Sequence, residues 1–185
     1  MKVFIGGSRN INRLNDEIRN RLHNIVKQGF EVLVGDANGA DKAVQKYFLE
    51  SKYNSLVVYC SGETCRNNLG SWKTTKVETP MGAHGLKFYM VKDHRMAIDA
   101  DYGFMLWDGK SAGTLNNMLN LIKQNKKLLI YFSPKKEFYT ISSTEDLQKI
   151  LTLCAHDSLA KIDKKISYSN IIKEISRPKQ IQLSL

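Results

Sequence analysis

Three glycine-containing segments each directly follow a short apolar run, at residues 6–9, 35–41 and 108–114. Glycine lets the backbone approach a phosphate closely, and the free N–H groups of a following helix attract an anion. Each segment alone is typical of an ordinary strand-to-helix turn. Together they predict a binding site for a phosphorylated ligand, formed by Gly6, Gly7, Ser8, Arg9, Gly35, Asp36, Ala37, Gly39, Asp41, Asp108, Gly109, Lys110, Ser111, Gly113 and Thr114.

Charged side chains in and near these segments could bind such a ligand or react with it. Arg9 could hold a phosphate through two parallel hydrogen bonds. The carboxylates at this edge could each accept a hydrogen bond from a ribose hydroxyl or transfer a proton, and they are Asp36, Asp41, Asp101 and Asp108. The competing roles are a first-turn helix charge for Asp41 and a loop position for Asp101.

Arg95 and Trp107 are two further candidates. Arg95 precedes the third glycine-containing segment and could reach a ligand bound there. Its alternative role is a surface ion pair with Asp93 or Asp99. Trp107 could stack on a base, although a position in the core or at its rim is more typical of such a residue.

Two common phosphate-binding motifs are not matched. The run Gly109-Lys110-Ser111 resembles the end of a P-loop, but Gly103 lies one residue too far upstream and inside an apolar run. No Gly-x-Gly-x-x-Gly pattern follows the first apolar run either. The pattern therefore does not predict a standard dinucleotide-binding fold.

Alternating strands and helices would bring the three segments together. Apolar runs predict five strands, at Lys2–Ile5, Glu31–Gly35, Ser55–Tyr59, Tyr102–Trp107 and Leu128–Phe132. Amphipathic spacing predicts helices over residues 13–28 and 91–100, and two more around apolar stripes at Ala40, Val44, Tyr47 and Phe48 and at Leu115, Met118, Leu119 and Ile122. Residues 60–90 predict a long loop. This alternation favours a Rossmann-like three-layer α/β sandwich with a mainly parallel sheet of at least five strands. Its carboxyl edge would carry all three segments.

The chain changes character at Ser133. A strand at Glu137–Ile141, a helix after the capping box at residues 143–146 and a helix over residues 167–175 are expected here. We therefore predict a nucleotide-binding domain over residues 1–132. Residues 133–185 form a small mixed C-terminal extension packed on the same domain, without chemistry of its own.

The net charge of +10 is spread over the 185 residues. Residues 1–132 hold 19 Lys and Arg against 12 Asp and Glu, and residues 133–185 hold 9 against 6. This excess suits an anionic partner, or it is an ordinary basic surface. No apolar run has the length of a membrane span, and residues 1–7 are too short for a signal peptide, so we expect a cytoplasmic protein without a membrane partner.

The cysteines support the same location. Their number is odd, and a chain of this length does not need disulfides, so Cys60, Cys65 and Cys154 predict a reducing compartment. Cys60 and Cys65 with His84 and His94 match no common zinc spacing. We expect no metal site.

These residues resemble the SLOG superfamily, which includes the Smf/DprA and Lonely Guy proteins, and in particular its YpsA-like branch. Residues 6–9 resemble the opening loop of that branch. Residues 35–41 resemble its second loop and the Gly-x-Ala-x-Gly-x-Asp element of the DNA-processing proteins. Arg95 and residues 108–114 are similar to the Lonely Guy arrangement, in which an arginine precedes a strand ending in Pro-Gly-Gly-x-Gly-Thr-x-x-Glu. The resemblance covers residues 1–132.

The resemblance implies a nucleotide or phosphorylated nucleoside as ligand, no required cofactor and a homo-oligomer. Lonely Guy enzymes hydrolyse the N-glycosidic bond of nucleoside monophosphates with that arginine and the terminal glutamate. Arg95 matches the arginine, but the glutamate position is Asn117, and an amide cannot act as a carboxylate. In an enzyme, Arg95 would be catalytic, and Asp108 or Asp36 would replace the missing carboxylate.

Three functions therefore remain open. The first is the binding of a nucleotide or nucleotide-derived ligand by a sensing or processing domain, which the replacement of glutamate by Asn117 favours. The second is an N-glycosidic hydrolase or deoxyribosyltransferase-like enzyme on nucleotides. The third is a nucleic-acid-binding protein of the DNA-processing type. The net charge favours it, but a pattern of basic and aromatic residues for stacking is missing.

Overall fold

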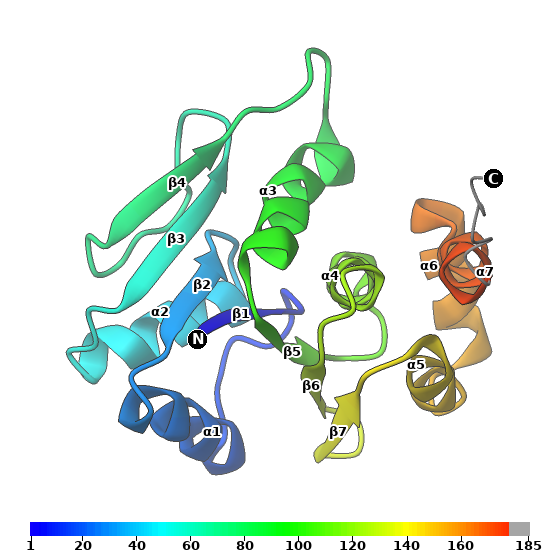
Figure 1. The fold of residues 1–185 in the computed structure, drawn as a ribbon, viewed down its shortest axis with the longest axis horizontal. Coiled ribbons are helices and arrows are strands. Elements are labelled where there is room, and N and C mark those ends of the chain that lie inside the picture. The colour runs from blue at the N-terminus through cyan, green and yellow to red at the C-terminus, as the bar shows by residue number, and fades with distance from the viewer. Residues whose placement is uncertain (178–185) are drawn as a thin grey trace, which may run out of the picture.

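The computed structural model describes residues 1–177, and it confirms the predicted Rossmann-like α/β fold (Figure 1). Within this range one sheet contains, in spatial order, β4 (Lys73–Val77), β3 (Leu56–Ser61), β2 (Glu31–Gly35), β1 (Lys2–Gly7), β5 (Tyr102–Trp107), β6 (Leu128–Phe132) and β7 (Glu137–Ile141). Neighbouring strands are parallel, except that β7 runs antiparallel to β6 at one edge.

Helices cover both faces of the sheet (Figure 1). One face packs against α1 (Asp16–Lys27) and α2 (Ala40–Glu50), and the other packs against α3 (Gly85–Asp99) and α4 (Ala112–Lys123). Beside α4, on its side away from α3, lie α5 (Thr144–Leu151), α6 (His156–Ile166) and α7 (Tyr168–Ser176). The fold is therefore a sandwich of three layers.

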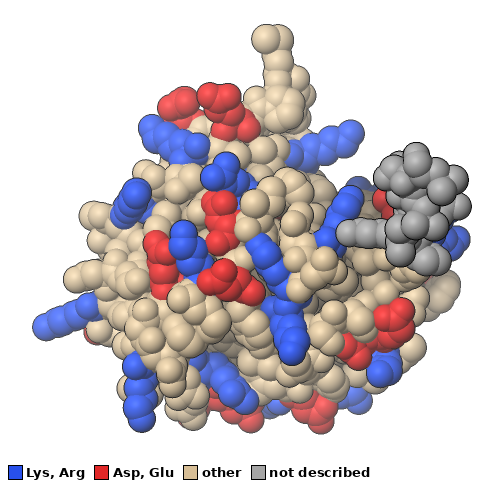
Figure 2. Space-filling view, in the orientation of Figure 1, with Lys and Arg blue, Asp and Glu red and all other residues tan. Residues whose placement is uncertain are grey.

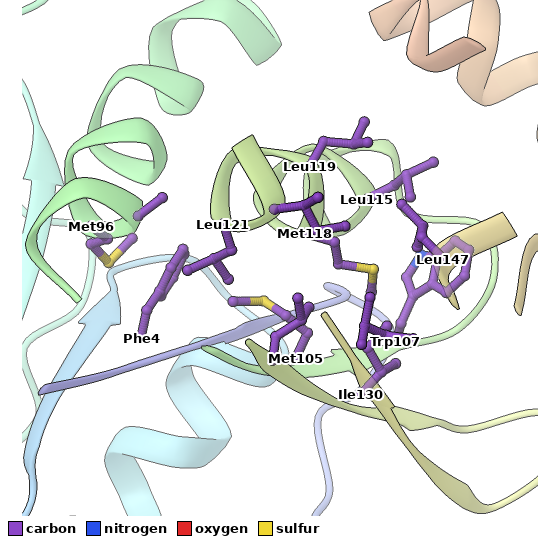
Figure 3. Close-up of a cluster of buried hydrophobic side chains, with 14 of the residues drawn as sticks. Phe4, Met96, Met105, Trp107, Leu115, Met118, Leu119, Leu121, Ile130 and Leu147 are labelled. Atoms are coloured by element: carbon purple, nitrogen blue, oxygen red, sulfur yellow. The ribbon is translucent and has the colours of Figure 1, made fainter. Parts of the chain in front are cut away.

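The central strand β1 shows why both faces are covered. Successive side chains of a strand point to opposite faces, and a parallel sheet is usually buried on both. Ile5 packs in the cluster that contains Val44 of α2. Phe4 packs in the opposite cluster, with Met96 of α3 and Met105 of β5 (Figure 3).

The order of the strands reverses beside β1, because β2 follows on one side and β5 on the other. Gly7 ends β1 at this point. A Cβ atom on Gly7 would lie 2.5 Å from the Leu106 carbonyl oxygen and 2.8 Å from Ala40 Cβ, so glycine is what allows β5 and α2 to approach. Such a reversal is where open α/β sheets bind their ligands.

The region predicted as a loop, residues 60–90, contains more structure than its sequence indicates. It holds the end of β3, all of β4 and the first turns of α3, which begins at Gly85 and not at residue 91. The strand β4 lies at the edge of the sheet and is mostly exposed or half-buried, with the sequence Lys-Thr-Thr-Lys-Val. An edge strand of this kind has no apolar run, which is why the prediction missed it.

The extension continues the main sheet. Its strand β7 pairs with β6 in antiparallel register. The Ser143 side chain caps α5 by accepting a hydrogen bond from Asp146 N, as the capping box predicts. Helix α6 was not predicted, and α7 matches the helix expected over residues 167–175 to within one residue.

The cysteines differ from their prediction. Cys60 at the end of β3 and Cys65 in the following turn are joined by a disulfide, with their Cα atoms 5.1 Å apart, whereas Cys154 is a free, half-buried thiol. The turn over residues 61–64 reverses the chain and brings the two sulfur atoms together. The prediction of a reducing compartment rested in part on a chain that does not need disulfides, and this pairing removes that part of the argument.

Two features are missing from the part of the chain that the structure describes. None of its helices is long and apolar enough to cross a membrane. None of its groups of His, Cys, Asp and Glu side chains is arranged to hold a metal ion.

Candidate functional site

A cavity of about 630 Å3 opens at the carboxyl edge of the sheet, between the ends of β1 and β5 and helices α3 and α4. Its volume lies in the range of small-molecule sites. All three glycine-containing segments reach it. The predicted residues that line it are Gly7, Arg9, Ala37, Asp41, Asp108, Lys110, Ser111, Gly113 and Thr114.

The other predicted residues lie behind the cavity wall, and they are Gly6, Ser8, Gly35, Asp36, Gly39 and Gly109. Gly39 has a φ of 84°, and a Cβ atom there would collide with the backbone of Arg9. Gly35 has no room for a Cβ atom because the Asp41 carboxylate and Lys92 Nζ lie against it. These glycines therefore shape the site without lining it.

Asp108 anchors two loops through hydrogen bonds to its carboxylate. Its Oδ1 accepts hydrogen bonds from Ser8 Oγ at 2.8 Å, Ser111 N at 2.9 Å and Lys110 N at 3.0 Å. Its Oδ2 accepts one from Asn10 Nδ2 at 3.0 Å. Burial acts to raise the pKa of Asp108, but these donors hold it below the usual value. A carboxylate that is ionised and already accepts four hydrogen bonds is poorly placed to transfer a proton.

Asp36 is held by Arg66, which follows the disulfide. Arg66 donates three hydrogen bonds to the carboxylate, from Nη2 at 2.6 Å, from its backbone N at 2.9 Å and from Nε at 3.1 Å. Burial acts to raise the pKa of Asp36, and the bonds from Arg66 lower it below the usual value. The Arg66 guanidinium also lies 3.9 Å from the centre of the Tyr89 ring. Asp36 therefore positions an arginine and an aromatic ring of the cavity wall.

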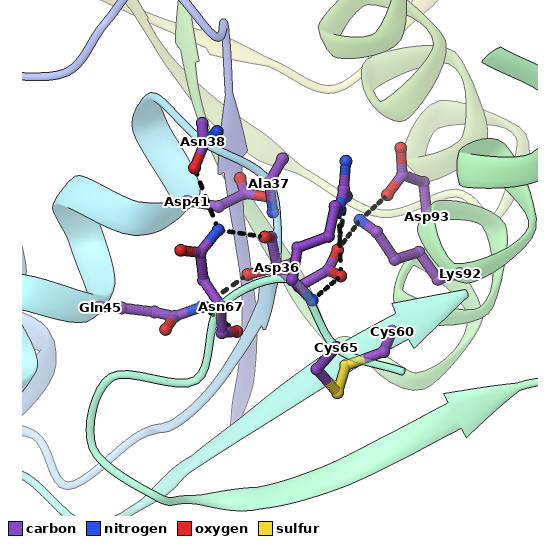
Figure 4. Close-up of polar contacts among 12 residues, drawn as sticks. Asp36, Ala37, Asn38, Asp41, Gln45, Cys60, Cys65, Asn67, Lys92 and Asp93 are labelled. Atoms are coloured by element: carbon purple, nitrogen blue, oxygen red, sulfur yellow. Dashed lines mark hydrogen bonds and ion pairs between the residues drawn. A yellow bond between two sulfur atoms is a disulfide. The ribbon is translucent and has the colours of Figure 1, made fainter. Parts of the chain in front are cut away.

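The floor of the cavity holds a buried charged cluster (Figure 4). Lys92 Nζ lies 2.7 Å from Asp93 Oδ1 and 3.9 Å from Asp36 Oδ1, and its side chain is 3% exposed. Burial acts to lower the pKa of Lys92, but the charges of Asp93 and Asp41 raise it, so the ammonium group stays charged. Burial raises the pKa of Asp41 to about 6, a change that Lys92 opposes and Asp93 reinforces. Among the carboxyl groups of this cluster, Asp41 is therefore the one whose pKa is raised.

Asn117 of α4 positions Asp93. The Asn117 amide faces two acceptors, and its nitrogen lies 3.0 Å from the Gly113 carbonyl oxygen and 3.2 Å from Asp93 Oδ2. Lys92 binds the other oxygen of Asp93. A carboxylate at position 117 would have no proton to donate to these acceptors when ionised. The amide is therefore the group that fits this place.

Arg95, Asp101 and Trp107 do not reach the cavity. Arg95 is 57% exposed and its Nε lies 2.9 Å from Asp99 Oδ2, which is the surface ion pair considered as its alternative role. Its side chain leaves α3 on a different side from Lys92 and Met96, which line the cavity. Asp101 accepts a hydrogen bond from the backbone N of Lys2. Trp107 is fully buried in the core.

Six residues of α3 line the cavity although the sequence predicts no site there, and they are Gly85, Leu86, Tyr89, Lys92, Asp93 and Met96. Their spacing of three to four residues is that of one helix face. This spacing is visible in the sequence, but the helix was expected to begin only at residue 91. In addition, a helix face that mixes aromatic, charged and apolar residues does not show the pattern of an amphipathic helix. No sequence pattern marks Arg66 as a site residue, because only the tertiary structure brings its loop to Asp36.

The outer part of the cavity is basic. Arg9 and Lys110 are exposed, line the cavity and form no ion pair within residues 1–177. The backbone amides of Ala112 and Gly113 in the first turn of α4 also have no hydrogen-bond partner in that range. Unpaired cations beside a free helix N-terminus attract an anion. The cavity is therefore acidic at its floor and cationic at its opening.

Comparison with protein-family models, curated proteins and solved structures finds no match for this chain. The class of protein is thus defined by its fold and its site alone, as a Rossmann-like α/β protein with a polar cavity at the point where the strand order reverses.

Proposed function

We propose that the protein binds a nucleotide or a nucleotide-derived ligand in the cavity between α3 and α4, as a sensing or processing domain. The observation that carries this proposal is the meeting of Arg9, Lys110 and the free amides of α4 at one opening. Cationic side chains and helix amides are the groups that bind phosphate in this class of fold.

The rest of the cavity supports a nucleoside. Its apolar surface includes Leu86, Tyr89 and Met96, against which a base can pack. The carboxylates of Asp41 and Asp93 lie deeper, where they can accept hydrogen bonds from sugar hydroxyls. The resemblance of the three glycine-containing segments to the SLOG superfamily supports the same ligand class. It also implies a homo-oligomer, which light scattering would test.

Three residues that the hydrolase hypothesis requires favour ligand binding over hydrolysis. Asn117 is an amide, Asp108 is occupied by four donors, and Arg95 lies outside the cavity. One observation keeps cleavage of an N-glycosidic bond as a second candidate. Asp41 lines the cavity and has a raised pKa, and a carboxyl group of this kind can supply a proton to a leaving group.

Nucleic-acid binding is the weakest of the three functions. On the face shown in Figure 2, Lys and Arg side chains are interspersed with Asp and Glu and form no continuous stripe. A surface that tracks a nucleic-acid backbone would concentrate the positive charge.

Titration calorimetry tests the proposal with nucleoside mono- and diphosphates, ADP-ribose and NAD. We expect one or more of these compounds to bind, and Arg9→Ala to weaken that binding roughly tenfold, because a charge-assisted hydrogen bond is lost. Arg13→Ala is the matched control, since Arg13 is exposed in the same loop but does not line the cavity. If none of the compounds binds, the proposed function is wrong. Release of free base on incubation would favour the second candidate.

A further inference from the structure

The C-terminal extension reaches the cavity through one side chain. Lys165, in the last turn of α6, lines the same cavity as Arg9 and Lys110. Ile162 and Ile166, which precede and follow it, are 1% and 9% exposed and pack in the core cluster that includes α4. Burial of these two side chains fixes the rotation of α6 and therefore the side on which Lys165 emerges.

The end of α6 is also held in place. Its C-terminal turn closes with a hydrogen bond of 2.7 Å from Ser167 N to the Asp163 carbonyl oxygen. The Asp163 carboxylate accepts hydrogen bonds from Ser169 N at 3.0 Å and Ser169 Oγ at 2.8 Å. The backbone that carries Lys165 is thus defined by the junction of α6 and α7.

Three of the five cationic side chains that line the cavity have no carboxylate partner within residues 1–177, although the Arg9 guanidinium lies 5.5 Å from the centre of the Tyr89 ring. Arg66 is paired with Asp36, and Lys92 is paired with Asp93. Arg9, Lys110 and Lys165 form no ion pair within residues 1–177.

The free cations come from three segments that are far apart in the sequence. Asp108, the carboxylate that lies in the same loop as Lys110, is already occupied by four donors. Three cations and the amides of α4 exceed what one phosphate needs, because a phosphate monoester carries a charge of about −1.5 to −2.

We propose that the extension completes the site, with Lys165, Arg9 and Lys110 together binding two linked phosphates. The ligand class is then a compound that contains a nucleoside diphosphate unit. This inference rests on the proposed function, and it assigns a role in binding to a part of the chain that lies outside the SLOG resemblance. A cavity of about 630 Å3 has room for such a unit.

The test compares the affinities of matched mono- and diphosphates of adenosine, guanosine, cytidine and uridine by calorimetry. Wild-type protein should bind the diphosphate of its preferred nucleoside at least tenfold more tightly than the monophosphate. Lys165→Ala should weaken diphosphate binding roughly tenfold and monophosphate binding less than threefold. Lys165→Arg should restore most of the affinity, because it keeps the charge.

The matched control is Lys164→Ala, since Lys164 is also exposed in the last turn of α6 but does not line the cavity. It should bind both ligands as the wild type does. If the wild type binds nucleoside phosphates and Lys165→Ala binds the diphosphate equally well, the role of Lys165 is excluded while the proposed function stands. If the wild type binds none of these nucleotides and neither ADP-ribose nor NAD, both proposals fail. Lys165 is exposed, so its variants should fold, and an unchanged thermal unfolding midpoint checks this.

Discussion

The Arg66 guanidinium donates two hydrogen bonds, of 2.6 and 3.1 Å, to the buried carboxylate of Asp36, and its Cζ lies 3.9 Å from the centre of the Tyr89 ring. One interaction thus connects the end of β2, the loop after β3 and helix α3. These three elements form one side of the cavity. We therefore expect the Arg66–Asp36 pair to stabilise the fold and to maintain the shape of the cavity.

Replacing Asp36 should destabilise the protein. Asp36→Asn removes the charge that compensates Arg66, and breaking a buried pair costs about 3–5 kcal/mol. Arg66 is 31% exposed, so water relieves part of this loss, and we expect about 2 kcal/mol in the free energy of unfolding measured with urea. Glu50→Gln is the control, because its ion pairs with Arg19 and Lys46 are exposed and should contribute less than about 0.5 kcal/mol. Equal effects of the two substitutions would contradict a special role for Asp36.

Asp41 should make stability fall as the pH rises from about 4 to 6. Its pKa is raised from 3.8 to about 6, so the folded state binds more protons than the unfolded state in this window. Stability falls with pH wherever that is true, here by an amount on the order of 2–3 kcal/mol. Asp36 and Asp108 have lowered pKa values, so their contributions are present above pH 3.8 and are lost only below it.

The substitution Asp41→Asn tests this pH dependence of stability. The amide oxygen can still accept the hydrogen bond from Ala37 N, but the side chain no longer titrates. Urea unfolding of both proteins between pH 4 and 7.5 should show a wild-type decline that is missing from the variant. Parallel curves would mean that Asp41 ionises normally, and they would remove the support for an acid–base role at the floor.

The sequence predicted most of the sheet and the meeting of the three glycine-containing segments at one edge, because both depend on local patterns. Apolar runs mark buried strands wherever they occur, and glycine after such a run marks a close approach, as at Gly7. The charged floor could not be predicted in the same way. Lys92 resembles any surface lysine of a helix, and only its burial under the loop of residues 35–41 shows that it needs a carboxylate partner.

Arg95 and Lys165 also show that sequence patterns do not give the direction of a side chain. Arg95 precedes the strand that leads into the third glycine-containing segment, which predicts a place near the ligand, but its direction from α3 depends on which neighbouring side chains are buried. No motif in residues 133–185 marks Lys165 as a binding residue. Its place in the cavity follows from the packing of Ile162 and Ile166, which a pattern of single residues does not reveal.

The disulfide should stabilise the loop that carries Arg66. Cys65 directly precedes Arg66, and the bond joins it to Cys60 across five positions of sequence. Restricting so short a loop in the unfolded chain contributes about 2 kcal/mol. The double substitution Cys60→Ser with Cys65→Ser should lower the free energy of unfolding by about that amount, whereas Cys154→Ser should change it by less. If a dithiol reductant has no effect on the wild-type unfolding midpoint, the bond contributes nothing to stability.

Asn117→Asp tests why the cavity holds an amide at this position, where the proposed resemblance to the Lonely Guy hydrolases would predict a carboxylate. The new oxygen would face the Gly113 carbonyl oxygen and Asp93 Oδ2, which lie 3.0 and 3.2 Å from the present nitrogen. Two acceptors disfavour the ionised form, so the pKa of the new carboxyl group should be raised in the folded state. The loss of stability, about 2 kcal/mol, should then appear above that pKa and should diminish as acid protonates the group.

Asn117→Ala is the reference for this effect, because it removes the hydrogen bonds without adding a charge. Its loss of stability should not depend on pH between 5 and 8, whereas the loss in Asn117→Asp should grow with pH over the same range. Urea unfolding of the two variants at several pH values distinguishes them. If Asn117→Asp is as stable as the wild type at pH 8, the cavity tolerates a second carboxylate beside Asp93. The amide would then no longer argue against the hydrolase.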